Sequence, residues 1–146
     1  MRQRVGPAAL RDGAGAAAGL GEGAMAKTVL TIDDSSSVRL MVKMTLKGAG
    51  YDVDDAADGA QGLKAATARA YDAIITDINM PVMDGVEFIR RFRATPQGKG
   101  VPLVVLTTES DAGLKQQARE AGAMGWLMKP FKQEQLVSVV QKVAGA

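Results

Sequence analysis

The sequence predicts an α/β domain in which a parallel sheet of five strands is doubly wound, with helices on both faces. Short apolar runs alternate with segments of helical period over about 120 residues, which is five successive strand–helix units. Glycine, proline and Asp-Gly pairs stand at the junctions between these segments. Strict alternation of strands and helices favours a parallel sheet with right-handed crossovers.

The five predicted strands are short, and each is followed by a helical segment. The second strand is more polar than the others, whereas the fourth is a continuous apolar run closed by two threonines. In chain order the predicted strands are Thr28–Ile32, Tyr51–Ala56, Ala73–Asp77, Leu103–Leu106 and Met124–Met128.

Capping and breaking residues bound the five predicted helices. Ser36 is the expected N-cap of the first helix, which Gly50 stops. The second helix follows Asp58-Gly59, the third ends at Pro96 and Gly98, and the fourth is capped by Ser110 or Asp111 and ends at Gly122. The apolar positions that define the first, third and last helices are Val38, Met41, Val42, Leu46 and Ala49; Val86, Phe88, Ile89 and Phe92; and Leu136, Val140 and Val143.

Composition excludes several classes of function. The chain of 146 residues is long enough for one domain with a full core, and its 47% apolar and 23% charged residues are ordinary globular values. It contains neither Cys nor His, which removes disulfides, thiolate sites, phosphohistidine donors and histidine bases. The absence of Cys fits a reducing compartment. A net charge of +2 gives little support to nucleic-acid binding, and no apolar run is long enough to span a membrane.

Residues 1–26 differ from the rest of the chain. Fourteen of these 26 residues are Gly or Ala, none is aromatic, and no strand or helix period is evident. Such a segment buries too little surface to offset its ordering entropy, so we expect a disordered N-terminal tail before a domain at residues 27–146. Arg2 and Arg4 could begin a signal peptide, but the continuous apolar stretch that a signal peptide requires does not follow them. A transit peptide is the alternative, and Met25 suggests that the first 24 residues are a start-site extension.

Polar residues follow four of the predicted strands. They are Asp33-Asp34, Asp77, Thr107-Thr108 and Lys129. Because the carboxyl ends of parallel strands share one edge of the sheet, these side chains should converge where ligands bind in α/β folds. Two carboxylates about 4 Å apart repel by about 4 kcal/mol at an effective dielectric near 20, so the cluster needs a cation. With oxygen ligands alone, Mg²⁺ is the best candidate.

This pattern resembles the receiver domain of bacterial response regulators. The residues that carry the resemblance are Asp33-Asp34, Asp77 with the following Ile78-Asn79-Met80-Pro81-Val82-Met83-Asp84-Gly85, Thr107, and Lys129-Pro130-Phe131. The match runs from Lys27 to the C-terminus and fills all the family's signature positions. The sequences 106–110 and 123–131 are similar in particular to the single-domain chemotaxis regulators of the CheY type. The resemblance implies the strand order 2-1-3-4-5 of flavodoxin-like folds.

The resemblance also implies a role for each site residue. Asp77 would accept a phosphoryl group from the phosphohistidine of a sensor histidine kinase, forming 4-aspartylphosphate. Asp34, Asp77 and the backbone carbonyl of Asn79 would hold Mg²⁺, with Asp33 acting mostly through a bound water.

Positive charge and a hydroxyl would then stabilise the transferred group. Lys129 would neutralise the phosphoryl oxygens, aided by a cis Lys129-Pro130 bond, and the Thr107 hydroxyl would donate to one of them. The family often carries Tyr or Phe where this chain has Trp126, a ring that swings inward when Thr107 moves. Trp126 is therefore either the switch or a core aromatic. The expected output face, made by the fourth helix, fifth strand and fifth helix, shows Lys115, Arg119, Trp126 and Met128.

The expected function is that of a cytoplasmic, monomeric, phosphorylation-activated regulator rather than an enzyme, with slow autodephosphorylation. The implied partners are the kinase and either a flagellar motor switch protein or a phosphatase, with no nucleic acid and no membrane. A phosphorelay shuttle or a phosphate sink is the alternative. A haloacid-dehalogenase-like phosphatase would usually have a second Asp where Asn79 stands, and Asp33-Asp34 would repel the phosphate of a flavodoxin-like FMN carrier.

Overall fold

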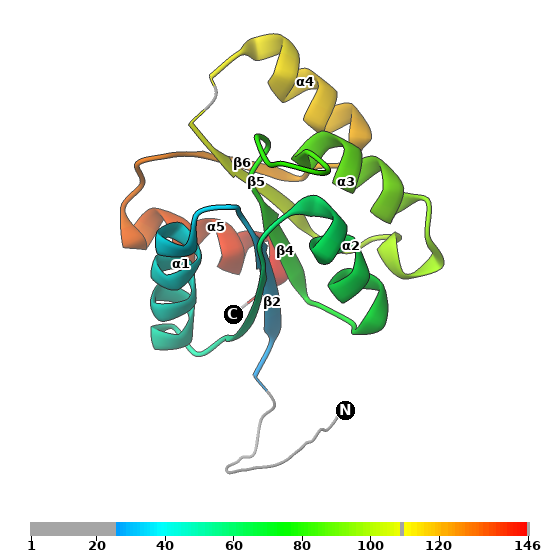
Figure 1. Cartoon of the computed structure of the whole chain (residues 1–146). Coiled ribbons are helices and arrows are strands. Elements are labelled where there is room, and N and C mark those ends of the chain that lie inside the picture. Colours follow the sequence, from blue (N-terminus) through cyan, green and yellow to red (C-terminus); the bar gives the residue numbers. More distant parts are fainter. Residues whose placement is uncertain (1–25, 109, 146) are drawn as a thin grey trace.

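The computed structural model of the protein describes residues 26–108 and 110–145, so the predicted tail lies outside the described residues apart from Ala26 (Figure 1). Strands and helices alternate as expected. In chain order they are β2 (Thr28–Ile32), α1 (Ser36–Gly48), β3 (Asp52–Ala56), α2 (Gly59–Ala68), β4 (Ala73–Thr76), α3 (Gly85–Arg93), the 3₁₀ turn η1 (Pro96–Gly98), β5 (Leu103–Thr107), α4 (Ala112–Ala121), β6 (Gly125–Met128) and α5 (Gln133–Ala144).

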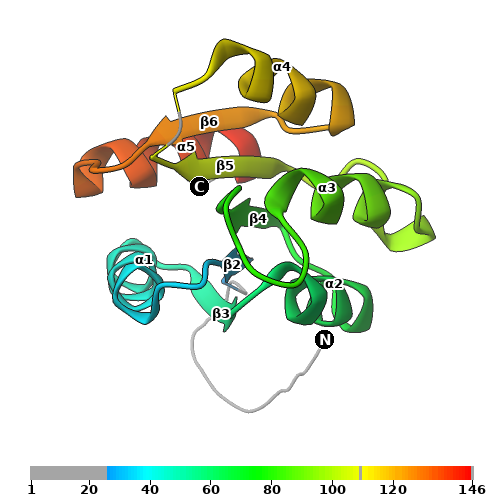
Figure 2. The same ribbon diagram turned by 45° about the horizontal axis from the view of Figure 1, so that its top comes forward.

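The strands form one sheet in the order β3-β2-β4-β5-β6, and every neighbouring pair is parallel. Counted along the chain this is the order 2-1-3-4-5, so the predicted doubly wound α/β topology is confirmed. Figure 2 shows α1 and α5 on one side of the sheet and α2 and α3 on the other. The order reverses between β2 and β4, and parallel sheets bind ligands beside such a reversal.

Two apolar cores lie on opposite faces of the sheet. Alternate residues of β4 show the division, because Ile74 packs toward α2, α3 and α4 whereas Ile75 packs toward α1 and α5. β2, β4 and β5 are buried along their whole length, while the edge strand β3 has only two buried residues, Val53 and Ala56. The buried central strands therefore read as apolar runs and hold their C-terminal ends in fixed positions.

The N-cap of α1 corrects one prediction. Ser35, not Ser36, caps this helix: Ser35 has an extended backbone, and its Oγ accepts a hydrogen bond from the Val38 amide at 3.3 Å. Ser36 already belongs to the first helical turn, and a run of three serines gives the sequence no means to choose among them. Of the two residues predicted to cap the fourth helix, Asp111 is the N-cap of α4, and Asp58, which precedes the second helix as expected, is the N-cap of α2.

Strand boundaries differ from the predicted ones by single residues. Tyr51 and Met124 precede their strands, Asp77 follows β4, and β5 extends to Thr107. Hydrogen bonding decides these limits, which apolar character alone does not reveal. In the described part of the chain, none of the helices has the length and apolar character of a membrane span.

The turn between β4 and α3 depends on a glycine. The Gly85 amide donates to the Ile78 carbonyl at 2.9 Å and closes the turn that follows Asp77. A Cβ at Gly85 would collide with the Asp77 carbonyl oxygen and would lie 2.9 Å from the Ile78 Cα. Because both obstacles are backbone, the turn cannot accept a side chain there without moving.

Replacing Gly85 with Ala should therefore lower the free energy of unfolding by about 1–3 kcal/mol, the usual cost of overpacking. Gly48→Ala is the matched control, because a Cβ there meets nothing within 4 Å and Ala favours the helix by up to about 1 kcal/mol. Urea unfolding of both variants measures the difference. A Gly85→Ala protein as stable as the wild type would contradict this account of the turn.

Candidate functional site

The sheet brings the predicted polar residues to one edge. Ile32 of β2 pairs with Thr76 of β4, and the hydrogen bond from the Asp77 amide to the Ile32 carbonyl at 2.9 Å extends this ladder by one residue. On the other side, the Lys129 amide donates to the Thr107 carbonyl at 2.8 Å just beyond β5 and β6. Asp33, Asp77 and Lys129 therefore each follow directly on a strand whose position the core fixes, and Thr107 is the last residue of one.

Three carboxylates form an acidic cluster at this edge. Asp33, Asp34 and Asp77 each offer an oxygen, and these oxygens all lie within 4.8 Å of one another. Asp33 is 1% exposed and Asp77 7% exposed, whereas Asp34 is open to solvent. The predicted convergence of these acids is confirmed by their positions.

Backbone amides orient the two buried carboxylates. Asp33 Oδ1 accepts from the Ser35 amide at 2.9 Å, and Asp77 Oδ1 accepts from the Ile78 amide at 2.7 Å. In each carboxylate the other oxygen, Oδ2, lies toward the Lys129 ammonium. A charged group held by amide hydrogen bonds keeps one rotamer, which is what a binding or reacting oxygen requires.

Lys129 reaches into the cluster from the end of β6. Its Nζ lies 2.8 Å from Asp33 Oδ2 and 3.3 Å from Asp77 Oδ2, and its side chain is 14% exposed. The Lys129-Pro130 peptide bond is cis, as the resemblance implied. One ammonium thus contacts both buried carboxylates.

Burial and charge shift two pKa values in the cluster. Burial raises the pKa of the Asp33 carboxyl, and the nearby charge of Asp77 adds to this, although hydrogen bonds from Lys129 and Ser35 oppose it. Burial alone would lower the pKa of the Lys129 ammonium, but the hydrogen bond to Asp33 and the charges of Asp77 and Asp33 raise it overall. Lys129 therefore stays charged, and three carboxylates against one ammonium still favour a further cation.

The donor set fits a hard divalent cation. Asp33, Asp34 and Asp77 supply carboxylate oxygens of mixed burial, which would leave positions open to water or to phosphate oxygens. Asn79 lies two residues beyond Asp77 in the exposed turn, where its backbone carbonyl remains the predicted additional ligand. Mg²⁺, with its preference for oxygen ligands, suits these residues.

Thr107 and Trp126 lie beside the cluster. Thr107 ends β5 and is completely buried. Trp126 of β6 pairs with Val105, which precedes Thr107 by two residues on β5. Because alternate residues of a strand face the same side of the sheet, Trp126 and Thr107 share one side. Trp126 is half-buried against the core formed with α2, α3 and α4, and its Nε1 donates to Met128 Sδ at 3.5 Å.

The sequence did not reveal the role of Arg39. This residue projects from α1 and donates from Nη1 to the Asp33 carbonyl at 2.6 Å, while its Nε donates to Asp55 Oδ2 at 2.9 Å. Arg39 therefore ties the loop that carries Asp33 and Asp34 to the edge strand β3. No local spacing signals this contact, since Asp33 and Asp55 become neighbours through the sheet.

Comparison with a family model matches residues 29–141 to the response regulator receiver domain. The probable chemotaxis protein CheY of Rhizobium etli is 36% identical over 119 residues, which is 81% of this chain and 92% of that protein. The transcriptional regulatory protein PrrA of Mycobacterium tuberculosis is 40% identical over 119 residues, or 82% of this chain. The match covers only 50% of the length of that second relative.

Solved structures give the same picture. The Vibrio cholerae chemotaxis protein CheY4 has a TM-score of 0.79 and 46% identity, covering 82% of this chain and 99% of that one. The receiver domain of a Pseudomonas aeruginosa sensor histidine kinase has a TM-score of 0.77 and 32% identity, covering 84% and 100% of the two chains. That second structure holds a magnesium ion coordinated in its active-site cleft.

Replacing Lys129 with Met should destabilise the metal-free protein at pH 7 by about 2–4 kcal/mol, because it leaves two buried carboxylates without their cation. Loss of the Lys129 hydrogen bond raises the pKa of Asp33 further above its ordinary value of 3.8. Since the cost comes from the ionised carboxylate, the deficit is full above that raised pKa and shrinks as the pH falls through it.

Urea unfolding without metal, between about pH 4 and pH 7, measures this difference. The exposed Lys64→Met is the control for loss of a lysine charge. A deficit of Lys129→Met that is equal at every pH would argue against the carboxylates as its cause.

Proposed function

This chain belongs to the response regulator receiver family, and on that basis we propose that Asp77 accepts a phosphoryl group from a sensor histidine kinase. The observation that carries the proposal is the setting of the Asp77 carboxylate. One oxygen is fixed by the Ile78 amide at 2.7 Å, and the other lies 3.3 Å from the Lys129 ammonium. A carboxylate held in this way, beside two further acids, suits phosphoryl transfer, which depends on positioning and neutralisation of charge.

In the proposed reaction an Asp77 oxygen bonds to phosphorus as the P–N bond of the kinase phosphohistidine breaks. The imidazole nitrogen leaves with the electron pair, so no external base is needed at Asp77. Lys129 neutralises charge on the phosphoryl oxygens, and the Thr107 hydroxyl donates to one of them. Water later hydrolyses the acyl phosphate slowly, which makes the protein a timed signal carrier rather than an enzyme with a substrate of its own.

We assign the metal site to the same cluster. Asp34, Asp77 and the backbone carbonyl of Asn79 would hold Mg²⁺, and Asp33 would act through a water. When bound, Mg²⁺ supplies positive charge to the phosphoryl oxygens and relieves the repulsion among the carboxylates.

The proposed output is a change in the face formed by α4, β6 and α5, here named the output face. Movement of Thr107 toward the phosphoryl group would open space on the side of the sheet that Trp126 shares. A shift of the Trp126 ring into that space changes what the output face presents. Phosphorylation alters the equilibrium only by its different affinity for the two arrangements.

The proposed partner is a flagellar motor switch protein or a phosphatase, and the protein acts in the cytoplasm as a monomer. The similarity to two chemotaxis proteins, each matched over nearly its whole length, supports this choice. A phosphorelay shuttle or phosphate sink is the second candidate, favoured by the similarity to a receiver domain that belongs to a sensor histidine kinase. A pull-down against a motor switch protein, with and without a phosphodonor, distinguishes the two roles, and phosphotransfer profiling against candidate kinases identifies the phosphodonor.

Asp77→Asn should abolish labelling by acetyl phosphate in the presence of Mg²⁺, because the amide removes the nucleophilic oxygen but keeps the shape of the side chain. Asp84→Asn is the matched control: Asp84 caps α3 through the Glu87 amide, and Asn caps equally well. Intact-mass measurement of both variants counts the phosphoryl group. Labelling retained in Asp77→Asn would sink the assignment.

Mg²⁺ should stabilise the folded protein, because the acidic cluster exists only in the folded state. At a hundredfold excess over Kd the gain is about 2.7 kcal/mol. Asp34→Ala should remove this response, and should raise the metal-free melting temperature by relieving repulsion. Thermal melts with and without millimolar Mg²⁺ check both effects, with Ca²⁺-free buffer throughout. Identical melts of the wild-type protein in both conditions would count against the metal site.

A further inference from the structure

The peptide group between Asp33 and Asp34 is held by a side chain from outside the acidic cluster. Arg39 of α1 donates from Nη1 to the Asp33 carbonyl at 2.6 Å. That carbonyl belongs to the same planar peptide unit as the Asp34 amide, so the hydrogen bond also fixes the backbone from which the Asp34 side chain extends. Arg39 therefore acts on the backbone of the loop rather than on the carboxylates.

The Asp34 carboxylate depends on that backbone for its position. Asp33 and Asp77 are buried, and each is fixed by a backbone amide and by the Lys129 ammonium. Asp34 is exposed, and no hydrogen bond or ion pair within the described part of the chain fixes its side chain. Mg²⁺ demands nearly ideal geometry from its ligands, so a carboxylate that binds it has to be placed by its surroundings. For Asp34 the loop backbone has to do this.

The guanidinium of Arg39 is itself anchored at the edge of the sheet. Its Nε donates to Asp55 Oδ2 at 2.9 Å, and the Arg39 side chain is only 17% exposed. Asp55 belongs to β3 and pairs with Thr31 of β2, the strand that leads into the loop. Figure 2 shows α1 beside this edge strand. A planar fork that binds a carbonyl through one nitrogen and a carboxylate through another has little freedom, so Arg39 fixes the loop relative to β3.

Asp55 also compensates the charge of Arg39. A guanidinium this close to the acidic cluster would by itself repel a bound cation, but the Asp55 carboxylate lies against it. Burial alone would raise the pKa of the Asp55 carboxyl, yet the hydrogen bonds and charges of Arg39 and Lys43 lower it overall. Asp55 is therefore ionised at neutral pH, and the Arg39–Asp55 pair brings no net charge to the metal site.

From these contacts we propose that Arg39 is a positioning residue for the magnesium site. By fixing the Asp33-Asp34 peptide group, it holds the Asp34 carboxylate where the ion binds and so lowers the Kd for Mg²⁺. This deepens the proposed function, because it rests on the metal site assigned there. Arg39 binds neither the ion nor the phosphoryl group. It removes freedom that the loop would otherwise lose at the moment of binding, which is the usual gain from preorganisation.

Lys43 offers a matched comparison on the same helix. It lies one turn after Arg39, and its Nζ lies 3.3 Å from Asp55 Oδ1. Both residues are therefore cations of α1 that pair with Asp55, but only Arg39 also donates to the Asp33 carbonyl. A comparison of variants at the two positions separates the contact with the loop from the loss of a charge and of a salt bridge.

The experiment compares the full-length wild type with Arg39→Gln, Arg39→Lys and Lys43→Gln. Thermal melts over a series of Mg²⁺ concentrations, at constant ionic strength, give the Kd of each protein. Arg39→Gln should raise the Kd about tenfold, the lower end of the effect usual for residues that orient metal ligands. Arg39→Lys should raise it similarly, because an ammonium keeps the charge but lacks the planar fork.

The direction of the change excludes a purely electrostatic cause. Removal of a cation near the site strengthens the binding of Mg²⁺, so Lys43→Gln should leave the Kd unchanged or slightly lower. A rise in Kd for Arg39→Gln therefore has the opposite sign to the effect of its lost charge. The melts without Mg²⁺ show whether each variant is folded, and Arg39→Lys tests the same contact if Arg39→Gln does not fold.

The rate of labelling by acetyl phosphate provides a second readout. Arg39→Gln should need about tenfold more Mg²⁺ for half of its maximal rate, in step with the rise in Kd. Its maximal rate at saturating Mg²⁺ should stay close to that of the wild type, because the contacts of Asp77 with Ile78 and Lys129 are intact. A general disturbance of the site would lower the maximal rate as well.

Three results would overturn the proposal. If both Arg39 variants bind Mg²⁺ as tightly as the wild type, the loop is positioned without Arg39. If Lys43→Gln weakens binding as much as Arg39→Gln, the salt bridges to Asp55 matter and the contact with the Asp33 carbonyl does not. Both of these results leave the metal site standing. A wild-type protein that binds no Mg²⁺ would refute the metal site of the proposed function and this role of Arg39 together.

Discussion

Everything at the functional edge of this protein depends on holding like charges together. Asp33 and Asp77 are buried at the ends of neighbouring central strands, and Asp34 stands beside them. The apolar cores on both faces of the sheet fix the strand ends, and backbone amides then fix each buried carboxylate. Lys129 compensates part of the charge and leaves the rest for a ligand. The fold thus stabilises an arrangement that the carboxylates by themselves would oppose.

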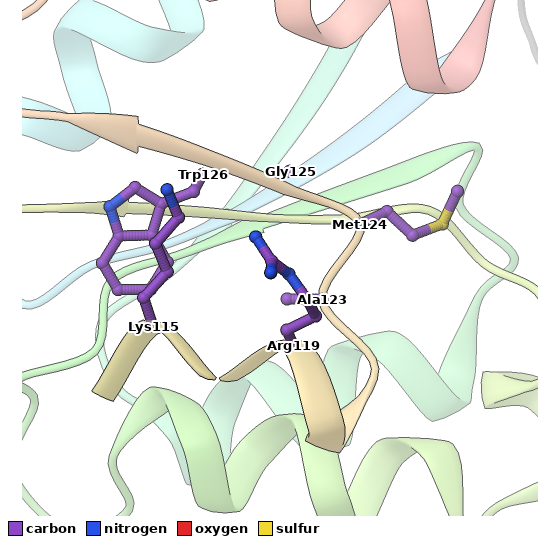
Figure 3. A pocket seen from close by; sticks show the side chains of 6 residues that line it. All are labelled: Lys115, Arg119, Ala123, Met124, Gly125 and Trp126. Atoms are coloured by element: carbon purple, nitrogen blue, oxygen red, sulfur yellow. The ribbon is translucent and has the colours of Figure 1, made fainter. Parts of the chain in front are cut away.

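The acidic cluster differs in charge and in construction from the basic pocket between α4 and β6, which Lys115, Arg119 and Trp126 line with three neighbouring residues (Figure 3). The cluster is built from residues that follow strands, so its geometry comes from the sheet. The pocket is built from Lys115 and Arg119 on α4 against Trp126 on β6, so its geometry changes if helix and strand move relative to each other. The sheet therefore fixes the geometry of the acidic cluster, whereas the shape of the pocket depends on the position of α4. Thr107 is buried at the end of β5 and faces the same side of the sheet as Trp126.

Much of this could be predicted from the sequence, because the informative features are local. Apolar runs ending in Asp33, Asp77 and Thr107 predict both the strands and the edge at which those residues meet. The sequence could not show the hydrogen bond from Lys129 to Asp33, because these residues lie far apart in the chain. Nor could it show that Arg39 links the Asp33 carbonyl to Asp55, because only the folded sheet brings Asp55 close. It also misplaced the cap of α1 among three consecutive serines, where backbone geometry alone decides.

Hydrogen bonds hold the end of α5 against the beginning of the described domain and the start of β3. Lys27 Nζ donates to the Ala144 carbonyl at 2.7 Å, and the Tyr51 hydroxyl donates to the Gly145 carbonyl at 2.7 Å. Both contacts lie where β2 and β3 begin, at the opposite edge of the sheet from Asp77 (Figure 1). A fluorophore, a surface tether or a fused protein attached through either end would therefore leave the domain from the side away from the acidic cluster. An immobilised chain would keep that cluster accessible to a large kinase.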